Sequence, residues 1–154
     1  MNLELADAAA TEALGAAIAR TLGARTGAII FLRGDLGAGK TTLARGLLRS
    51  LGVEGAIRSP TYTLMEVYEA PGKTLLHLDL YRLSDALELT NLGLHDFPPE
   101  KTWWLVEWPE RGVGRLPHAD LEVRLSVLAD GRSADIEAAD QPLQAALARA
   151  LKLT

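Results

Sequence analysis

The stretch "GAIIFLRGDLGAGKTTLARGLL", residues 27–48, decides the fold class of this chain. It begins with a short apolar run bounded by glycines, residues 27–34, which is typical of a buried strand. After a glycine-rich turn, Leu43, Leu47 and Leu51 recur at every fourth residue and Gly52 follows, so we expect a helix there. A strand, a tight turn and a helix in this order indicate an α/β fold.

The turn itself, "GDLGAGKT" from Gly34 to Thr41, matches the pattern G-x-x-x-x-G-K-[ST]. Glycines let consecutive backbone N–H groups point inward, and the helix that follows presents its positive end at the same place. In this pattern Lys40 reaches the β- and γ-phosphates of a nucleotide, and the Thr41 hydroxyl is a ligand for Mg²⁺. A turn with glycines needed only for geometry would give no reason for the Lys-Thr pair.

The rest of the sequence predicts further strands and helices around this unit. Residue patterns indicate helices over residues 8–22 and 141–151, a weaker helix over 85–92, a loop over 95–101, a strand over 102–108, and two hairpins formed by residues 61–70 with 74–82 and 120–128 with 132–138. We therefore predict a P-loop NTPase-like three-layer α/β sandwich with a mixed sheet and two antiparallel hairpins. Residues 1–154 are expected to form a single domain.

Composition and charge exclude several classes of function. The chain has 16 basic and 20 acidic side chains, a formal net charge of -4, which argues against a broad basic surface for nucleic acid. It has no cysteine, and its three histidines lack metal-ligand spacing, so disulfides, thiol catalysis and zinc are not expected. Neither a signal-like N-terminus nor a long apolar run is present, so we expect a cytoplasmic protein that does not contact a membrane.

Two strand-like runs end in an acid, and their patterns differ. In "TLLHLDLYR", residues 74–82, the polar residues His77, Asp79 and Tyr81 alternate with leucines, so this strand is expected to have one solvent-exposed face. "WWLVE", residues 103–107, is apolar on both parities before Glu107, as in a strand buried on both faces near the centre of a sheet.

An acid at the C-terminal end of such a buried strand is where P-loop proteins place the carboxylate that supports Mg²⁺. We therefore assign Glu107 to the metal and leave Asp79 as the residue that addresses the γ-phosphate or the attacking water. The simpler alternatives are a strand-end surface acid for Glu107 and a solvated hairpin face for Asp79.

Three further residues are candidate neighbours of this site. "RSPTYTL", residues 58–64, follows the second helix, where many P-loop proteins carry a mobile segment that senses the γ-phosphate. Ser59 and Thr61 could reach phosphate or metal from there, although Pro60 equally indicates a plain entry into a strand. Trp108 is more simply a core or interface residue, but it stands directly beside Glu107.

The combination of these motifs resembles the bacterial TsaE (YjeE) family. The motifs are "GDLGAGKTT", "SPTYTL", "HLDLYRL" and "LVEWPE", in this order, and the likeness runs from about residue 11 to about residue 132. The resemblance implies a P-loop ATPase that binds Mg²⁺, hydrolyses ATP slowly, and is needed for making threonylcarbamoyladenosine next to the anticodon of tRNA. It further implies partnership with TsaD and TsaB, an indirect relation to tRNA, and no membrane.

The resemblance also implies roles for individual residues. Asp79 resembles the residue required for hydrolysis, Thr41 and Glu107 the pair that supports Mg²⁺, and Trp108 a neighbour whose loss disturbs the site. An adenine pocket is implied near Thr11 and Arg132, which nothing in the spacing would have selected. The phosphates would be held by the loop and the start of its helix, namely Gly37, Ala38, Gly39, Lys40, Thr41 and Thr42.

Other nucleotide-dependent classes are the alternatives. A small-molecule kinase would share the phosphate loop and add an arginine-rich lid, and no such insertion is visible. A GTPase would need N-K-x-D and D-x-x-G motifs, which are absent. A binding module in which ATP sets a conformation for partners is compatible with slow hydrolysis, since both can belong to one cycle.

Overall fold

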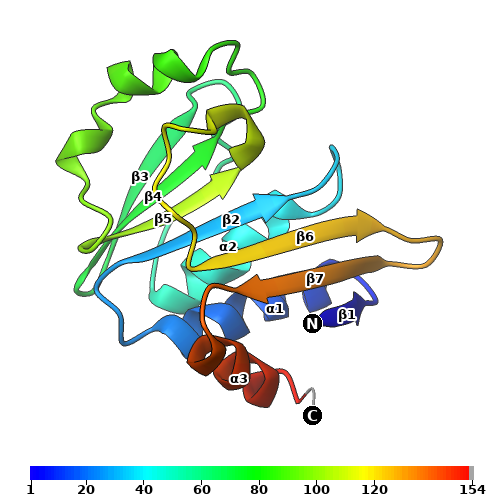
Figure 1. Cartoon of the computed structure of the whole chain (residues 1–154). Helices are drawn as coiled ribbons and strands as arrows, with labels where there is room; N and C mark the ends of the chain where they lie inside the picture. Colours follow the sequence, from blue (N-terminus) through cyan, green and yellow to red (C-terminus); the bar gives the residue numbers. More distant parts are fainter. Residues whose placement is uncertain (153–154) are drawn as a thin grey trace.

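A seven-stranded mixed sheet runs through the computed structural model, which describes residues 1–152 (Figure 1). The strand order is β1-β7-β6-β2-β5-β4-β3. The four strands in the middle, β6, β2, β5 and β4, are mutually parallel, whereas the hairpins β3–β4 and β6–β7 and the pair β1–β7 are antiparallel. The strands are β1 (Asn2–Leu5), β2 (Ala28–Arg33), β3 (Met65–Ala70), β4 (Lys73–Asp79), β5 (Thr102–Glu107), β6 (Leu121–Val127) and β7 (Arg132–Ala138).

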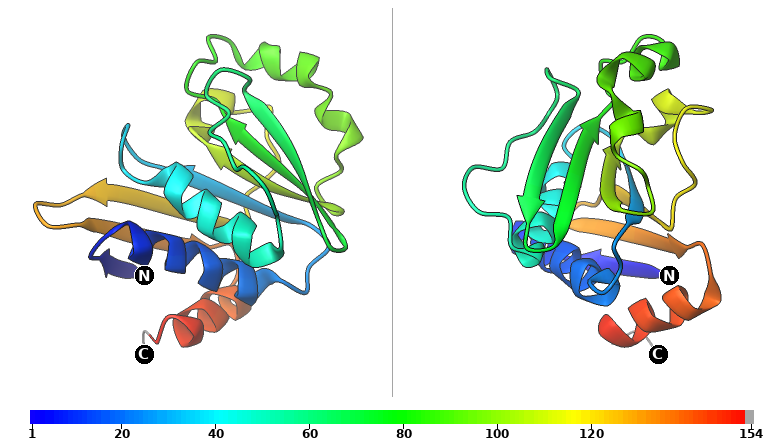
Figure 2. Two further views of the ribbon diagram at one scale, coloured as in Figure 1. Left: turned by 180° about the vertical axis from the view of Figure 1, so that it is seen from behind. Right: turned by 90° about the vertical axis from the view of Figure 1, so that its left-hand side faces the viewer.

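Helical segments cover both faces of the sheet, as Figure 2 shows. Ile18, Leu47 and Trp103 belong to the larger core, on the face covered by the α-helices. Leu78, Leu89 and Trp104 belong to a smaller core on the opposite face, beneath the 3₁₀ segments. The predicted three-layer α/β fold is thus confirmed. The α-helices are α1 (Ala8–Leu22), α2 (Lys40–Leu51) and α3 (Gln141–Ala150), and the 3₁₀ segments are η1 (Ala86–Leu92), η2 (Leu94–Asp96) and η3 (Pro109–Gly112).

The helices α1 and α2 touch each other through glycines. A Cβ atom added to Gly15 of α1 would lie 2.2 Å from the carbonyl oxygen of Leu43, and one added to Gly46 of α2 would lie 2.2 Å from the carbonyl oxygen of Glu12. Each glycine therefore faces the backbone of the other helix. Because α2 begins at the glycine-rich turn, this close packing also determines where the turn lies.

The prediction that one face of the strand 74–82 is exposed to solvent is wrong. In β4 the residues from Leu75 to Asp79 are all buried, with His77 0% and Asp79 4% exposed. The strand lies between β3 and β5. Its polar residues, His77 and Asp79, lie on the face of the sheet that α2 and the glycine-rich turn cover. Tyr81 lies beyond the end of the strand. Alternation correctly separated the two faces but did not indicate which of them meets water.

Smaller differences concern the ends of elements. Residues 61–64 form a turn, so the first hairpin begins at Met65, and the weak helix over 85–92 is the 3₁₀ segment η1. Part of the predicted loop 95–101 belongs to η2, and the short edge strand β1 was not predicted. Within residues 1–152, no helix has the length and apolar character that crossing a membrane requires.

The contact between α1 and α2 makes a testable prediction. In an unhindered helix, replacing glycine with alanine stabilises by about 1 kcal/mol through helix propensity. At Gly15 the added methyl group collides with backbone, so Gly15→Ala should instead lower the free energy of unfolding by about 1–3 kcal/mol, measured by urea denaturation.

Ala13 lies exposed on the same helix and is the matched control. Ala13→Gly should cost only the propensity difference of about 1 kcal/mol. A Gly15→Ala variant that is more stable than the unsubstituted chain would show that the two helices do not touch there.

Candidate functional site

The glycine-rich turn joins the end of β2 to the first residue of α2. Gly37 has φ +80° and Gly39 has φ +110°, both in the left-handed region that residues with a Cβ rarely adopt. Gly39 is the N-cap of α2, and no side chain accepts a hydrogen bond from the first turn of that helix. The N–H groups at this helix start are therefore left for another acceptor, and an anion such as phosphate suits them.

Lys40, the first residue of α2, is buried beneath this turn. Its Nζ donates hydrogen bonds to the carbonyl oxygens of Gly34, at 2.6 Å, and Asp35, at 2.9 Å, and it lies 4.5 Å from the centre of the Trp108 ring. Burial lowers the pKa of the Lys40 ammonium, while the charges of Glu107, Asp79, Glu110 and Asp35 act in the opposite direction. An entering anion would add one more favourable charge.

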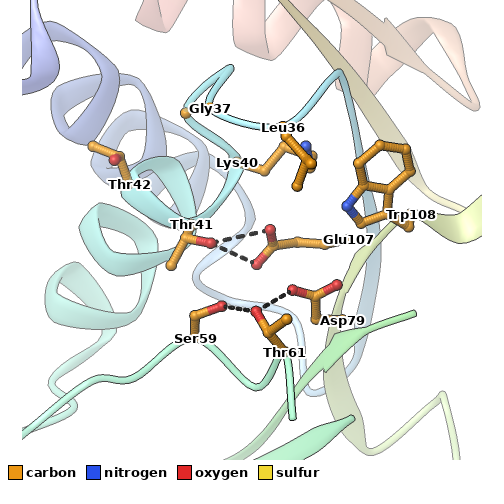
Figure 3. Close-up of a pocket in the computed structure, with 11 residues that line it drawn as sticks. Leu36, Gly37, Lys40, Thr41, Thr42, Ser59, Thr61, Asp79, Glu107 and Trp108 are labelled. Atoms are coloured by element: carbon orange, nitrogen blue, oxygen red, sulfur yellow. Dashed lines mark hydrogen bonds between the residues drawn. The ribbon is translucent and has the colours of Figure 1, made fainter. Parts of the chain in front are cut away.

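Glu107 ends β5 directly opposite the first turn of α2. The Thr41 hydroxyl lies 3.1 Å from each of its carboxylate oxygens, Oε1 and Oε2 (Figure 3). The Nε2 atom of His77, on the neighbouring strand β4, lies 2.6 Å from Oε2. Glu107 is only 2% exposed, so these contacts replace the water that a carboxylate would otherwise bind.

Asp79 lies beside Glu107 because β4 and β5 are parallel and pair these two residues. Its Oδ1 accepts a hydrogen bond from the backbone N–H of Tyr81, at 3.1 Å. Its Oδ2 accepts one from the Thr61 hydroxyl, also at 3.1 Å, and the Thr61 and Ser59 hydroxyls lie 2.8 Å apart (Figure 3). The segment after α2 is thus tied to the second acid through hydroxyl groups.

Lys40, Thr41, Asp79 and Glu107 line one cavity of about 230 Å³ at the carboxyl end of the central strands. Figure 3 shows residues from the turn, α2, the segment after α2, β4 and β5 arranged around it. Of the residues singled out in the sequence, ten meet here, and Leu36 is added to them. The lining residues are Leu36, Gly37, Gly39, Lys40, Thr41, Thr42, Ser59, Thr61, Asp79, Glu107 and Trp108.

A second cavity, of about 260 Å³, is also lined by the glycine-rich turn. Thr11 and Arg132 both line it, as do Gly37, Gly39 and Thr42, which it shares with the first cavity. The Arg132 guanidinium donates hydrogen bonds to the carbonyl oxygens of Gly37 and Ala38, both at 3.2 Å. Residues from the two ends of the chain are thereby joined to the turn.

Trp108 takes a left-handed backbone conformation, with φ 57° and ψ 49°, where the chain leaves β5. This conformation is uncommon for a residue other than glycine. It turns the indole ring over the ammonium group of Lys40, and the ring of Tyr81 stands 5.0 Å away. Arg111 lies over both rings, with its guanidinium carbon 5.5 Å from the centre of the Tyr81 ring and 5.9 Å from that of Trp108.

Thr41 and Glu107 provide the oxygens that could hold a metal ion. Residues 1–152 contain no cluster of three or more histidine or carboxylate side chains of the kind that forms a metal site by itself. Mg²⁺ does not need one, because it keeps several waters and binds through one or two protein oxygens together with phosphate. The donor set therefore fits Mg²⁺ bound with a nucleotide better than it fits a metal held by protein alone.

The sequence did not single out His77 as a site residue. The alternation with leucines predicts that it shares a solvent-exposed face with Asp79 and Tyr81, yet the side chain contacts Glu107 and is fully buried. The usable signal was its spacing, since residues 77 and 79 share one face of β4. Because Asp79 is assigned to the site, His77, two residues earlier, is expected on the same face of the strand.

Solved structures include one with the same fold. A crystal structure of the Bacillus subtilis protein YdiB superposes with a TM-score of 0.78, and the match covers 99% of this chain and 94% of that one. The sequences are 24% identical in this comparison, so the likeness concerns the fold alone.

Sequence comparisons lead to one family. The model of "Threonylcarbamoyl adenosine biosynthesis protein TsaE" matches residues 5–134. A protein of Haemophilus influenzae named tRNA threonylcarbamoyladenosine biosynthesis protein TsaE is 46% identical over 108 residues, which cover 70% of this chain and 68% of that protein. The Synechocystis protein of the same name is 44% identical over 120 residues, 72% of this chain and 71% of the relative. The chain therefore belongs to the TsaE family of tRNA threonylcarbamoyladenosine biosynthesis proteins.

Proposed function

We propose that the chain is a single-domain, Mg²⁺-dependent ATPase that supports the formation of threonylcarbamoyladenosine in tRNA together with TsaD and TsaB. One observation carries the proposal. Lys40, Thr41, Asp79 and Glu107 converge on one cavity at the start of α2, where the backbone N–H groups are not capped by a side chain. A buried cation, two acids and free N–H groups at one point suit a bound polyphosphate and the hydrolysis of its terminal bond.

ATP would lie across the glycine-rich turn. The backbone from Gly37 to Thr42, Ala38 included, would surround the phosphates, with Lys40 exchanging its two backbone carbonyl partners for β- and γ-phosphate oxygens. The adenosine would occupy the second cavity, between Thr11 and Arg132. That cavity joins the first through Gly37, Gly39 and Thr42, so one nucleotide can reach both.

Thr41 and Glu107 would hold Mg²⁺ beside the phosphates. The ion, when bound, supplies positive charge that stabilises the charge developing on the transferred phosphoryl group. Binding requires the Thr41 hydroxyl to turn its lone pairs outward and to give up its present hydrogen bond to Glu107. The two side chains lie within 3.1 Å of each other, so both would be available to hold the same ion.

Asp79 would orient the water that attacks the γ-phosphorus in line with the leaving oxygen. Water gives its oxygen to phosphorus, the bond between phosphorus and the β,γ-bridging oxygen breaks, and a proton is released. The carboxylate of Asp79 accepts a hydrogen bond from that water, and Lys40 neutralises negative charge on the phosphoryl oxygens. Thr61 would fix the orientation of the Asp79 carboxylate, since its hydroxyl donates a hydrogen bond to Oδ2, and the Ser59 hydroxyl would hold Thr61 in place.

TsaD and TsaB are the proposed partners, and tRNA is engaged through them. The chain's net charge of -4 does not favour a broad contact of its own with tRNA. The Trp108 ring lies over Lys40 with the Tyr81 ring beside it, so Trp108 is the proposed site neighbour through which changes outside the cavity would reach the ATP site. A small-molecule kinase would need room for a second substrate and a cover of arginines, which no observation here favours.

Removing the Lys40 charge tests nucleotide binding. Lys40→Ala should weaken ATP binding by about 10- to 100-fold, the usual effect of losing one or two charge-assisted hydrogen bonds. Isothermal titration calorimetry measures the change, and Lys101→Ala, at an exposed loop position, is the control expected to bind normally. Unchanged affinity in Lys40→Ala would mean that no nucleotide lies on this turn.

Removing the Asp79 charge tests catalysis separately from binding. Asparagine keeps the size of the side chain and can still accept the hydrogen bond from the Tyr81 N–H. Asp79→Asn should therefore lower ATP turnover by about 100-fold or more while ATP affinity changes little. Phosphate release and calorimetry give the two quantities, and a parallel loss of affinity would make Asp79 a binding or structural residue.

The partners are tested by steady-state ATPase measurements with purified TsaD and TsaB. Slow hydrolysis by the chain alone should rise at least about tenfold when both are present, because they would fix residues 58–64, whose Thr61 donates a hydrogen bond to Asp79. TsaD and TsaB with the Asp79→Asn variant are the matched control and should show no stimulation. A rate that the partners leave unchanged would contradict their proposed role.

A further inference from the structure

We propose that His77 is a positioning residue that holds the Glu107 carboxylate in the orientation in which it supports Mg²⁺. This inference rests on the proposed function, since it concerns the metal-supporting acid of the same site. It assigns a role to a buried polar side chain that neither the phosphate loop nor the two acids explain.

The contact between the two side chains is short and dry. His77 Nε2 lies 2.6 Å from Glu107 Oε2, with the side chains 0% and 3% exposed. An ionised carboxylate has no proton to donate, so the imidazole donates and Nε2 carries the hydrogen. Oε1 of Glu107 has the Thr41 hydroxyl as its sole hydrogen-bond donor in the described part of the chain. His77 therefore secures one oxygen and leaves the other for the cavity.

The strand pairing explains how the ring reaches the acid. His77 of β4 pairs with Leu105 of β5, two residues before Glu107, and Asp79 pairs with Glu107 itself. Residues two apart on a strand share a face, so His77, Asp79 and Glu107 all lie on the side covered by α2. The histidine thus approaches Glu107 diagonally from deeper in the sheet, behind the carboxylate as seen from the cavity, whose lining it does not join.

The other ring nitrogen, Nδ1, indicates that His77 is not simply a packing residue of the hydrophobic core. Among the described residues, Nδ1 of His77 is a buried atom without a hydrogen-bond partner. The neighbouring positions Leu75, Leu76 and Leu78 are leucines with 0% exposure. A leucine at position 77 would bring no unsatisfied polar atom of its own, whereas the histidine buries Nδ1 without a partner in residues 1–152, so its presence is explained only if Nε2 is needed. Its contact with Glu107 supplies that need.

Groups behind a metal ligand normally fix its direction and strengthen its binding. Their loss costs about 10- to 100-fold in metal affinity or activity. Because Glu107 is buried, a carboxylate freed from His77 would keep the Thr41 hydroxyl as its hydrogen-bond donor and would turn toward it, and this change of orientation would weaken the support of Mg²⁺.

The test compares His77→Leu with His77→Gln. Glutamine presents an amide N–H near the place of the imidazole Nε2, whereas leucine keeps the volume and removes the donor. For each purified chain, calorimetry measures binding of the non-hydrolysable analogue AMP-PNP without Mg²⁺ and then across a Mg²⁺ titration. His118→Leu, at an exposed histidine, is the matched control, and Glu107→Gln is the reference for loss of the carboxylate charge.

The expected result separates an effect on Mg²⁺ binding from an effect on nucleotide binding. His77→Leu should raise the Mg²⁺ concentration for half-maximal enhancement of binding by about tenfold, in the direction of Glu107→Gln, with affinity in the absence of Mg²⁺ unchanged. His77→Gln should recover most of the loss. A Mg²⁺ dependence in His77→Leu equal to that of the unsubstituted chain would overturn the role of His77 and leave the proposed function intact. Absence of any Mg²⁺ effect in the unsubstituted chain would overturn both.

A spectroscopic readout keeps the inference testable if His77→Leu fails to fold. Long-range ¹H–¹⁵N correlation spectra of the unsubstituted chain should show hydrogen on Nε2 of His77, and Glu107→Gln should shift that resonance while those of His95 and His118 stay in place. An unprotonated Nε2, or a His77 signal indifferent to Glu107→Gln, would overturn the contact itself.

Discussion

The parallel pairing of β2, β5 and β4 is the constraint on which the site depends. Parallel neighbours end at the same edge of a sheet, so Glu107 at the end of β5 and Asp79 at the end of β4 lie side by side. The turn after β2 carries Lys40 and Thr41 to that edge as the first residues of α2. An antiparallel β4 would have carried Asp79 to the far edge, and the acids would be separated. The strands that pair in antiparallel fashion with this part of the sheet, β3 on one side and β7 and β1 on the other, lie outside the unit.

The packing of α2 against α1 fixes the position of the glycine-rich turn relative to these strand ends. Gly15 and Gly46 let α1 and α2 meet backbone to backbone, which holds the start of α2 against the ends of the strands. Thr41 consequently contacts Glu107, and Lys40 lies beneath the turn, close to Trp108. A small movement of the helix would lengthen these contacts together, because they all depend on the position of the same first turn.

The polar groups at this edge form hydrogen bonds within the chain. Lys40 donates to its own turn, Thr41 donates to Glu107, and Thr61 donates to Asp79. A buried charge without such partners would be strongly unfavourable, so the contacts stabilise the site. Under the proposed function, ATP and Mg²⁺ exchange these partners for phosphate and metal, while the contact of His77 with Glu107 is kept. The site thus changes partners without exposing charge.

The sequence by itself determined the strand–turn–helix unit, the identity of Lys40, Thr41 and Glu107 as candidate residues, and the fold class. These features depend on neighbours along the chain: glycine spacing, leucine periodicity and an acid at the end of an apolar run. Thr11 and Arg132 emerged only through the resemblance to a family, and the structure joins them at one cavity across more than a hundred residues of chain. Only the tertiary structure decided that the polar face of β4 is buried, because periodicity shows which residues share a face and not what packs against it. Because α2 packs over that face, His77 is buried in contact with Glu107, although the sequence pattern predicts a surface position for it.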